Sequence, residues 1–141
     1  MTHARWRKTA MLPLVLVGAY FWLPAAGARS VSTVPYPVAD VWPSAIRFLR
    51  IDRNCVIREK DEAAGYILFD YPEGQKLRKG SLELIRTRDS EGRDVTRVAA
   101  SLADLPHYVE QLLIDKLAVK LREDRGSPAP PPRKPEPDAG E

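Results

Sequence analysis

The most constraining feature of this sequence is the stretch from Val41 to Tyr71, in which two different hydrophobic periods follow one another. Its first part has apolar residues at the i, i+4, i+7 and i+8 spacing of one helix face. Its second part alternates apolar and polar residues on both sides of the acidic turn Asp61–Gly65, as half-buried strands do. The stretch therefore predicts a helix, a strand, a tight turn and a second strand. The residues of the helix face are Val41, Ala45, Phe48 and Leu49.

Residues that begin or end regular structure set the expected bounds. Asp40 is expected to cap the first helix, which places Pro43 in the first turn, where the missing amide of proline costs nothing. Gly65 closes the turn between the two strands and is available for a positive φ. Ahead of the helix, Val31–Tyr36 predicts a short strand at a sheet edge, because the prolines at its end cannot donate to a ladder.

The pattern continues with two more strands and a long helix. Ser81–Arg88 and Val95–Leu102 alternate apolar and polar residues, with the turn Asp89–Gly92 between them. The final helix is expected to have Asp104 as its N-cap and to end at Gly126. Its apolar residues recur every four positions, which predicts a broad stripe that covers the sheet. The stripe consists of Val109, Leu113, Leu117 and Leu121, flanked by Leu112, Ile114 and Ala118.

Together these elements predict an α+β fold. Their order is β-α-β-β-β-β-α, an antiparallel meander with its helices on one face and the long C-terminal helix as the main cover. A chain of 141 residues suffices for one ordinary domain. We assign that domain to residues 29–125, between an N-terminal leader at 1–28 and a proline-rich tail at 126–141.

The leader has the three parts of an export signal. MTHARWRK is basic, Thr9–Leu23 is apolar, and Ala26-Gly27-Ala28 provides the small residues that a signal peptidase accepts. We therefore expect cleavage after Ala28 and a periplasmic domain. The alternative is an uncleaved inner-membrane anchor, since Ala10–Ala28 is 19 residues without a charge, close to the ~20 that span a bilayer. Both alternatives place the domain outside the cytoplasm. Membrane contact is expected only through this segment, if it is retained.

Charge and composition narrow the choice of partners. Three of the 22 basic residues lie in the leader, and without them 19 basic and 19 acidic residues remain. A domain without net positive charge binds nucleic acid poorly, so we expect no nucleic-acid partner. The tail from Gly126 holds six prolines and no large apolar residue, which predicts a disordered, partly extended segment. Two roles stay open for it, a solvated terminus or a spacer or docking segment for an envelope partner.

Few residues carry catalytic chemistry. Cys55 is the only cysteine, which excludes an intrachain disulfide, and its place on the strand face of Ile57 favours a small buried hydrophobe over a reactive thiol. His107 is the only histidine after the leader, and a surface or capping role is favoured over a catalytic base. His107 and Glu110 share a helix face as metal ligands can, but the spacing indicates no third ligand. With no glycine-rich phosphate loop either, we expect no catalytic residue, no metal, no cofactor and no enzymatic activity.

The aromatic residues are the candidates for a binding groove. Trp42, Tyr66, Tyr71 and Tyr108, together with Tyr36, are placed to line the space between helix and sheet. Aromatic residues at such positions usually belong to the core. A groove for a ligand or a partner is the alternative interpretation.

The central stretch VW…A…FL…CVI…D…AGYILFDY resembles the repeating module of the BamC (NlpB) outer-membrane assembly lipoproteins. The resemblance implies a helix-grip fold, in which a long C-terminal helix grips a meandering sheet, and a place in an envelope assembly. It covers roughly a third of the chain after the leader, which carries one such module where those lipoproteins carry two, and no lipobox cysteine. The matching positions are Trp42, Ala45, Leu49, Ile57, Asp61, Gly65 and Tyr71.

Two functions follow from these observations. The first is a non-enzymatic envelope domain that binds a protein partner through its sheet face or helix-sheet groove, as an accessory subunit of an envelope assembly. The alternative is a carrier of a small ligand or lipid, which needs an apolar cavity between helix and sheet. A hydrolase or metal enzyme centred on His107 is the least favoured hypothesis.

Overall fold

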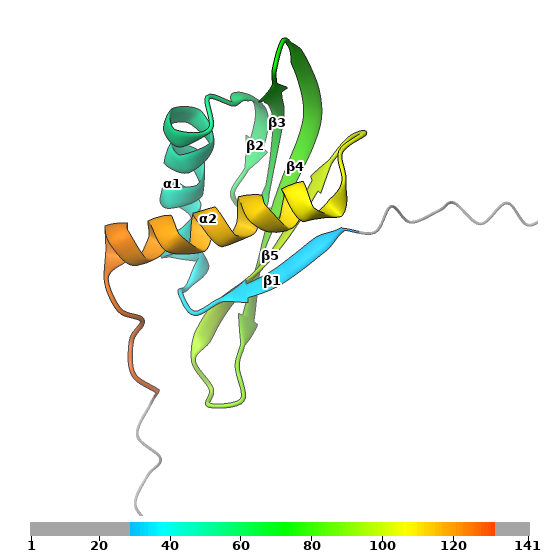
Figure 1. Ribbon diagram of the computed structural model, residues 1–141. Coiled ribbons are helices and arrows are strands. Elements are labelled where there is room, and N and C mark those ends of the chain that lie inside the picture. Colours follow the sequence, from blue (N-terminus) through cyan, green and yellow to red (C-terminus); the bar gives the residue numbers. More distant parts are fainter. Residues whose placement is uncertain (1–28, 132–141) are drawn as a thin grey trace, which may run out of the picture.

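The computed structural model describes residues 29–131, so the predicted leader at 1–28 and the end of the predicted tail, 132–141, lie outside the described residues. Five antiparallel strands form one sheet, and the helices pack on one face of it (Figure 1). The predicted α+β fold and the order of its elements are confirmed. The elements are β1 (Ser30–Val34), α1 (Val38–Arg47), the π-helical turn η1 (Phe48–Asp52), β2 (Val56–Asp61), β3 (Tyr66–Glu73), β4 (Lys76–Arg88), β5 (Asp94–Leu102) and α2 (His107–Arg125).

The sheet has the strand order β1-β5-β4-β3-β2, so β2 to β5 form the predicted meander and β1 joins it beside β5. β1 is short and lies at the edge, as predicted, with Ser30 opposite Ala100 and Val34 opposite Thr96. β2 is the other edge strand, and its pairing with β3 is irregular at Ile57. Short or irregular edges of this kind resist pairing with another sheet.

The core lies between the helices and the inner face of the sheet. α1 and η1 bury the predicted apolar face, and alternate residues of β3, β4 and β5 meet it because successive side chains of a strand point to opposite faces. Each fully buried Leu or Phe contributes roughly 1.5–3 kcal/mol, so this layer is the main source of stability in a chain with a single cysteine. The buried residues include Val41, Ala45, Phe48, Leu49, Leu113, Ile114, Leu117 and Leu121 from the helices and Ile67, Phe69, Leu82, Leu84, Val98, Ala100 and Leu102 from the sheet.

The start of α1 differs from the prediction. α1 begins at Val38 with Pro37 as its N-cap residue, so Asp40 is not the cap and Pro43 lies in the second turn. The prediction was wrong because Pro37 itself leads the chain into the helix, and its carbonyl already accepts the Asp40 amide at 2.9 Å. The Asp40 carboxylate pairs instead with Arg125, at 3.4 Å.

The predicted cap of α2 was also wrong. α2 begins at His107, after Pro106, and no side chain caps it, so Asp104 is not the N-cap. Asp104 has φ 59°, in the left-handed region that aspartate tolerates better than most residues. It therefore belongs to the turn between β5 and α2, where its carboxylate reaches Arg78 at 3.5 Å.

The hairpin of β3 and β4 is longer than predicted. β4 begins at Lys76 rather than Ser81, because its first residues pair with the end of β3. β3 itself continues through Pro72 to Glu73. Proline is tolerated at this position because β2 pairs with β3 only up to Asp70. Beside Pro72 no β2 residue is present to need a hydrogen bond from a backbone amide, which proline lacks.

α2 carries apolar residues on two sides. Leu112, which was expected to flank the buried stripe, is 46% exposed, whereas Ile114 is buried and Val109 packs against the edge of the core. Because an α-helix has 3.6 residues per turn, Leu112 falls on the outer side with Tyr108 and Val119, both of which are exposed.

The turn between β2 and β3 depends on Gly65. Its φ of 73° is positive, as the sequence predicted. Its amide donates to the Asp61 carbonyl at 2.8 Å, and its carbonyl accepts the Leu84 amide at 2.7 Å. A Cβ atom at this position would lie 2.6 Å from the Leu84 carbonyl oxygen. Glycine is therefore required at this turn for both conformation and space.

Gly65→Ala is expected to lower the free energy of unfolding by about 2–4 kcal/mol, because left-handed strain adds to a clash with backbone that cannot move aside. Gly74→Ala is the matched control: its φ is 58°, and a Cβ there meets nothing within 4 Å. The control should lose only about 1 kcal/mol. Urea unfolding of the two variants and the parent measures both values, and equal losses would contradict the proposed clash.

Candidate functional site

Glu110 is the only charged side chain that is buried among residues 29–131. Its Oε1 accepts the backbone amide of Leu102 at 2.8 Å. Its Oε2 lies within hydrogen-bond distance of the Ser30 amide, at 3.2 Å, the Ser30 hydroxyl, at 3.1 Å, and Nδ1 of His107, at 3.0 Å. One carboxylate thus joins β1, β5 and α2. We call this arrangement the Glu110 clasp.

The clasp lies where the β1–β5 ladder ends. β1 pairs with β5 only as far as Ser30 opposite Ala100, while β5 continues to Leu102. The Leu102 amide therefore has no partner in β1, and the Glu110 carboxylate accepts its hydrogen bond instead. The side chain of a helix thus closes the open end of a sheet ladder and fixes α2 against it.

Opposing effects set the protonation of Glu110. Burial alone would raise the pKa of the Glu110 carboxyl, but the hydrogen bonds from His107, Leu102 and Ser30 outweigh it and hold that pKa below its ordinary value. The carboxylate is therefore the stable form at neutral pH.

The clasp brings a serine, a histidine and a glutamate together without the arrangement of a hydrolase. A nucleophilic serine needs its hydroxyl against the histidine ring. Here the Ser30 hydroxyl bonds to the backbone carbonyl of His107, at 3.1 Å, and to Glu110. The side chains of His107 and Glu110 contact each other directly, rather than pointing at one position where a metal ion could bind both. No group of three potential metal ligands occurs within the described part of the chain.

The predicted aromatic candidates do not lie together. Trp42 is buried and Tyr71 is half-buried, and both pack in the core between helix and sheet. Tyr66 lies on the opposite face of the sheet, where its hydroxyl donates to Glu59. Tyr108 is 72% exposed on the outer side of α2. The four residues therefore divide between the core and two separate surfaces.

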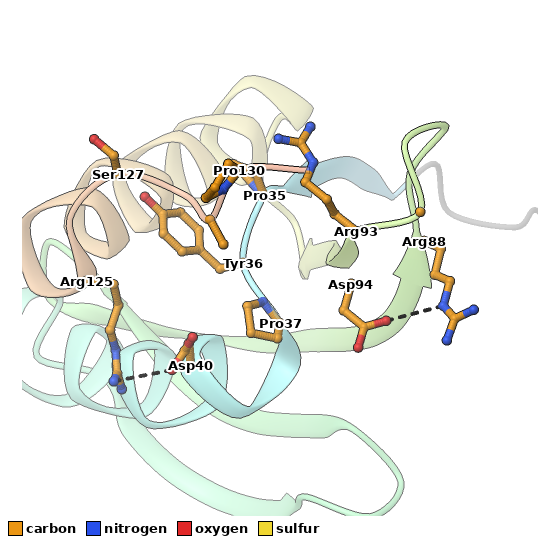
Figure 2. Close-up of a pocket in the computed structure, with 12 residues that line it drawn as sticks. Pro35, Tyr36, Pro37, Asp40, Arg88, Arg93, Asp94, Arg125, Ser127 and Pro130 are labelled. Carbon is orange, nitrogen blue, oxygen red and sulfur yellow. Dashed lines mark hydrogen bonds and ion pairs between the residues drawn. The ribbon is translucent and has the colours of Figure 1, made fainter. Parts of the chain in front are cut away.

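Tyr36 belongs to a cleft of about 850 Å³ between the β1–α1 link, the β4–β5 hairpin and the chain after α2 (Figure 2). Its buried ring is held by a hydrogen bond from its hydroxyl to the Gly126 carbonyl, at 2.8 Å. Figure 2 shows two arginines of the lining paired with carboxylates: Arg125 with Asp40 and Arg88 with Asp94, each at 3.4 Å. The third arginine of the lining, Arg93, pairs with Asp89 within the β4–β5 hairpin. Balanced charges of this kind favour neither an anion nor a cation.

The start of the predicted tail contributes to this cleft. Ser127, Ala129 and Pro130 line it together with Pro35 and Tyr36. The lining includes neither histidine nor cysteine. The cleft is therefore a depression of proline, aromatic and polar surface, and its two aspartates are paired with arginines.

The face of the sheet opposite the helices is uncovered. Its aliphatic residues are partly exposed and come from four different strands. Paired charges lie among them, notably Arg58 with Asp70 and Arg29 with Glu83. We call this surface the outer face. Its exposed aliphatic residues are Val31, Val56, Leu68 and Ile85, 38–46% exposed.

No family model matches the chain, and neither does any curated protein. Neither α1 nor α2, the helices of the part from 29 to 131, has the length and apolar character needed to cross a membrane.

The sequence-based search for a site did not find the Glu110 clasp. The signal is present, because Glu110 lies one helix turn before Leu113 and Ile114, on the side of α2 that faces the core. A charged residue at a core-facing helix position indicates a buried polar contact. Its partners could not be named, because Ser30 and Leu102 come from distant or irregular parts of the sequence.

Glu110→Gln is expected to destabilise the fold at pH 7 by about 1–3 kcal/mol, because the charge-assisted bonds weaken in a buried position. The pKa of Glu110 is lower in the folded state than in the unfolded chain. Its contribution to the free energy of unfolding is therefore complete above the unfolded-state pKa of about 4.3, and it is lost as the pH falls through the folded-state pKa. Urea unfolding between pH 7 and pH 3 should therefore show that the free energy of unfolding falls less on acidification in the variant than in the parent. Glu123→Gln is the control, since Glu123 is mostly exposed. A parent and a Glu110→Gln variant with the same acid dependence would contradict the clasp.

Cys55 is expected to be unreactive in the folded protein. It is buried, and desolvation raises the pKa of its thiol to about 11, although the charge of Arg53 acts in the opposite direction. At pH 8 the folded protein should react with iodoacetamide about a hundredfold more slowly than the urea-unfolded chain, because only the thiolate reacts. Labelling rates followed by mass spectrometry measure the ratio. Similar rates in the two states would show that the thiol is accessible.

Proposed function

We propose that this chain is a non-enzymatic domain of the cell envelope that binds a protein partner through its outer face. The observation that carries the proposal is an uncovered sheet surface with exposed aliphatic residues from several strands and paired charges among them. Interfaces between proteins combine apolar contact with satisfied polar groups in this way.

One row of the outer face supports a protein rather than a nucleic acid as the partner. One row across the sheet holds Val31, Ala99, Glu83 and Tyr66, on β1, β5, β4 and β3. The acid in this row pairs with Arg29, so the row carries little net charge. Nucleic acid binding depends on an excess of basic groups, whereas a flat surface of mixed character suits another protein.

The filled interior favours this function over a carrier of a small ligand or lipid. Phe69, Leu49 and Leu117, which lie between the helices and the sheet, are each at most 1% exposed. A ligand cavity of several hundred Å³ would require these side chains to move apart. The clefts around Tyr36 and beside Tyr108 are open and lie on the surface.

The sequence supports an envelope location and a place in an assembly. The predicted leader implies export, either with cleavage or with a retained anchor. The resemblance of Val41–Tyr71 to the BamC module suggests an accessory subunit of an envelope assembly and a helix-grip arrangement. In the Glu110 clasp the Ser30 hydroxyl bonds to the backbone carbonyl of His107 and to Glu110 rather than to the histidine ring, which supports a non-enzymatic role.

Photocrosslinking tests the outer face directly. A photoreactive amino acid at Leu68 or Ile85 should give the same covalent partner in intact envelopes, because both positions lie on this face. Ile51 on η1 is the matched control, since it is apolar and 67% exposed but lies outside the sheet. Mass spectrometry identifies the adducts. Adducts at Ile51 equal to those at Leu68, or none at either outer-face position, would refute the proposal.

A further inference from the structure

The Glu110 clasp lies beside the junction at which the leader is expected to be removed. Ser30, which donates to Glu110 from its amide and from its hydroxyl, is the second residue after that junction. Its amide nitrogen lies 3.2 Å from Oε2 of Glu110. Because consecutive backbone nitrogens are at most about 3.8 Å apart, the backbone nitrogen of Arg29 lies within about 7 Å of this carboxylate.

Cleavage after Ala28 would change the charge of the Arg29 nitrogen. In the uncleaved chain this nitrogen belongs to a neutral amide, whereas cleavage turns it into an α-ammonium with an ordinary pKa of about 7.7–8.0. Glu110 is only 3% exposed. Solvent therefore screens an attraction between the ammonium and this carboxylate less than it screens a pair of surface charges.

The charges of the neighbouring strands are already paired. The Arg29 guanidinium pairs with Glu83 of β4 on the outer face, and Arg78 pairs with Asp104 beyond the end of β5. The part of β5 beside the clasp, Ala99–Leu102, has no charged residue. The sheet therefore offers no further cation to the Glu110 carboxylate among the described residues.

The residues of α2 leave the same carboxylate without a Lys or Arg partner. Within residues 29–131, the one ionisable group in contact with Glu110 is the ring of His107, which is charged only when protonated. The other acid at this end of the helix, Asp115, accepts a hydrogen bond from Gln111. Glu110 is thus a buried anion held by hydrogen bonds, beside a nitrogen that processing can make cationic.

We propose that removal of the leader stabilises the folded domain, because the α-ammonium created at Arg29 gives the Glu110 carboxylate a cationic partner. The hydrogen bonds of the clasp stay as described, and only the charge on the first nitrogen changes. The processed chain is then harder to unfold than its precursor. The effect depends on the expected cleavage after Ala28, and it does not depend on the outer face.

The stabilisation has a defined dependence on pH. Attraction to Glu110 raises the pKa of the α-ammonium in the folded protein above its unfolded value of about 7.7. Its contribution is therefore complete below that value and is lost as the pH rises through the folded-state pKa. Glu110 stays ionised throughout this range, because its own pKa is held below the ordinary value.

Blocking the amine tests the proposal. The chain that begins at Arg29 is compared with the same chain acetylated at its N-terminus, which removes the charge and leaves every side chain in place. Urea unfolding at pH 7 should give an equilibrium constant for unfolding about 3- to 10-fold larger for the acetylated chain. At pH 9.5 the ratio should fall below about 1.5, because the free amine is then neutral. A chain that retains Ala26-Gly27-Ala28 should behave like the acetylated one, since its ammonium lies about 10 Å further along.

Two carboxylate variants identify the partner of the ammonium. In Glu110→Gln the ratio at pH 7 should fall to about 1, whereas in Glu83→Gln it should stay within about twofold of the parent ratio. Circular dichroism verifies that both variants fold. Should Glu110→Gln not fold, the Glu83→Gln ratio and the pH dependence of the parent decide the outcome.

Several results would overturn the proposal. One is equal stability of the free and acetylated parent chains at pH 7, and another is a ratio that is the same at pH 9.5. A ratio lost in Glu83→Gln but kept in Glu110→Gln would assign the ammonium to the wrong carboxylate. An N-terminal mass of the envelope protein that includes the whole leader would also refute it, and this result would leave the proposed role of the outer face intact.

Discussion

The structure depends on the burial of one side of α2 against one face of the sheet. Leu113, Leu117 and Leu121 bring α2 onto strands that are far apart in the sequence. Apolar contact alone is non-directional, so it does not fix the position of α2 along the direction of the strands. The Glu110 clasp supplies that definition, because a carboxylate with partners in β1 and β5 has one position in which all of them are satisfied.

This combination explains how a buried charge is tolerated in a small domain without a disulfide. A carboxylate without partners would cost several kcal/mol in such a place. The hydrogen bonds of Glu110 offset that cost, and no buried side-chain nitrogen or oxygen among residues 29–131 lacks a partner. The specificity of the helix–sheet packing therefore comes from polar contacts inside an apolar layer, while most of the stability comes from the layer itself.

Much of the fold followed from hydrophobic periodicity, and the errors have physical causes. The two periods predicted β2 to β5 and both α-helices in order, because burial on one face imposes the spacing of 2 or 3.6 residues on the sequence. The helix starts were misplaced because Asp40 and Asp104 resemble caps, while Pro37 and Pro106 determine where the helices begin. Leu112 was placed in the core because residues one position apart on a helix lie 100° apart, and the assumed stripe was too wide.

The candidate site was less predictable than the fold. Tyr66 and Tyr71 differ by an odd number of positions on one strand, so their side chains lie on opposite faces and cannot share a groove. The contacts of Glu110 join residues separated by up to 80 positions, which no local pattern encodes. The outer face became visible only when the packing showed which apolar residues remain in water.

The end of the β1–β5 ladder has a consequence for the boundary of the domain. Because Glu110 occupies the place in which a longer β1 would bond to Leu102, Ser30 is the first residue that the sheet requires. The junction expected between Ala28 and Arg29 lies just before this residue. Removal of residues 1–28 would therefore take no hydrogen bond from the described ladder. The described ladder is therefore the same whether the expected leader is cleaved or retained.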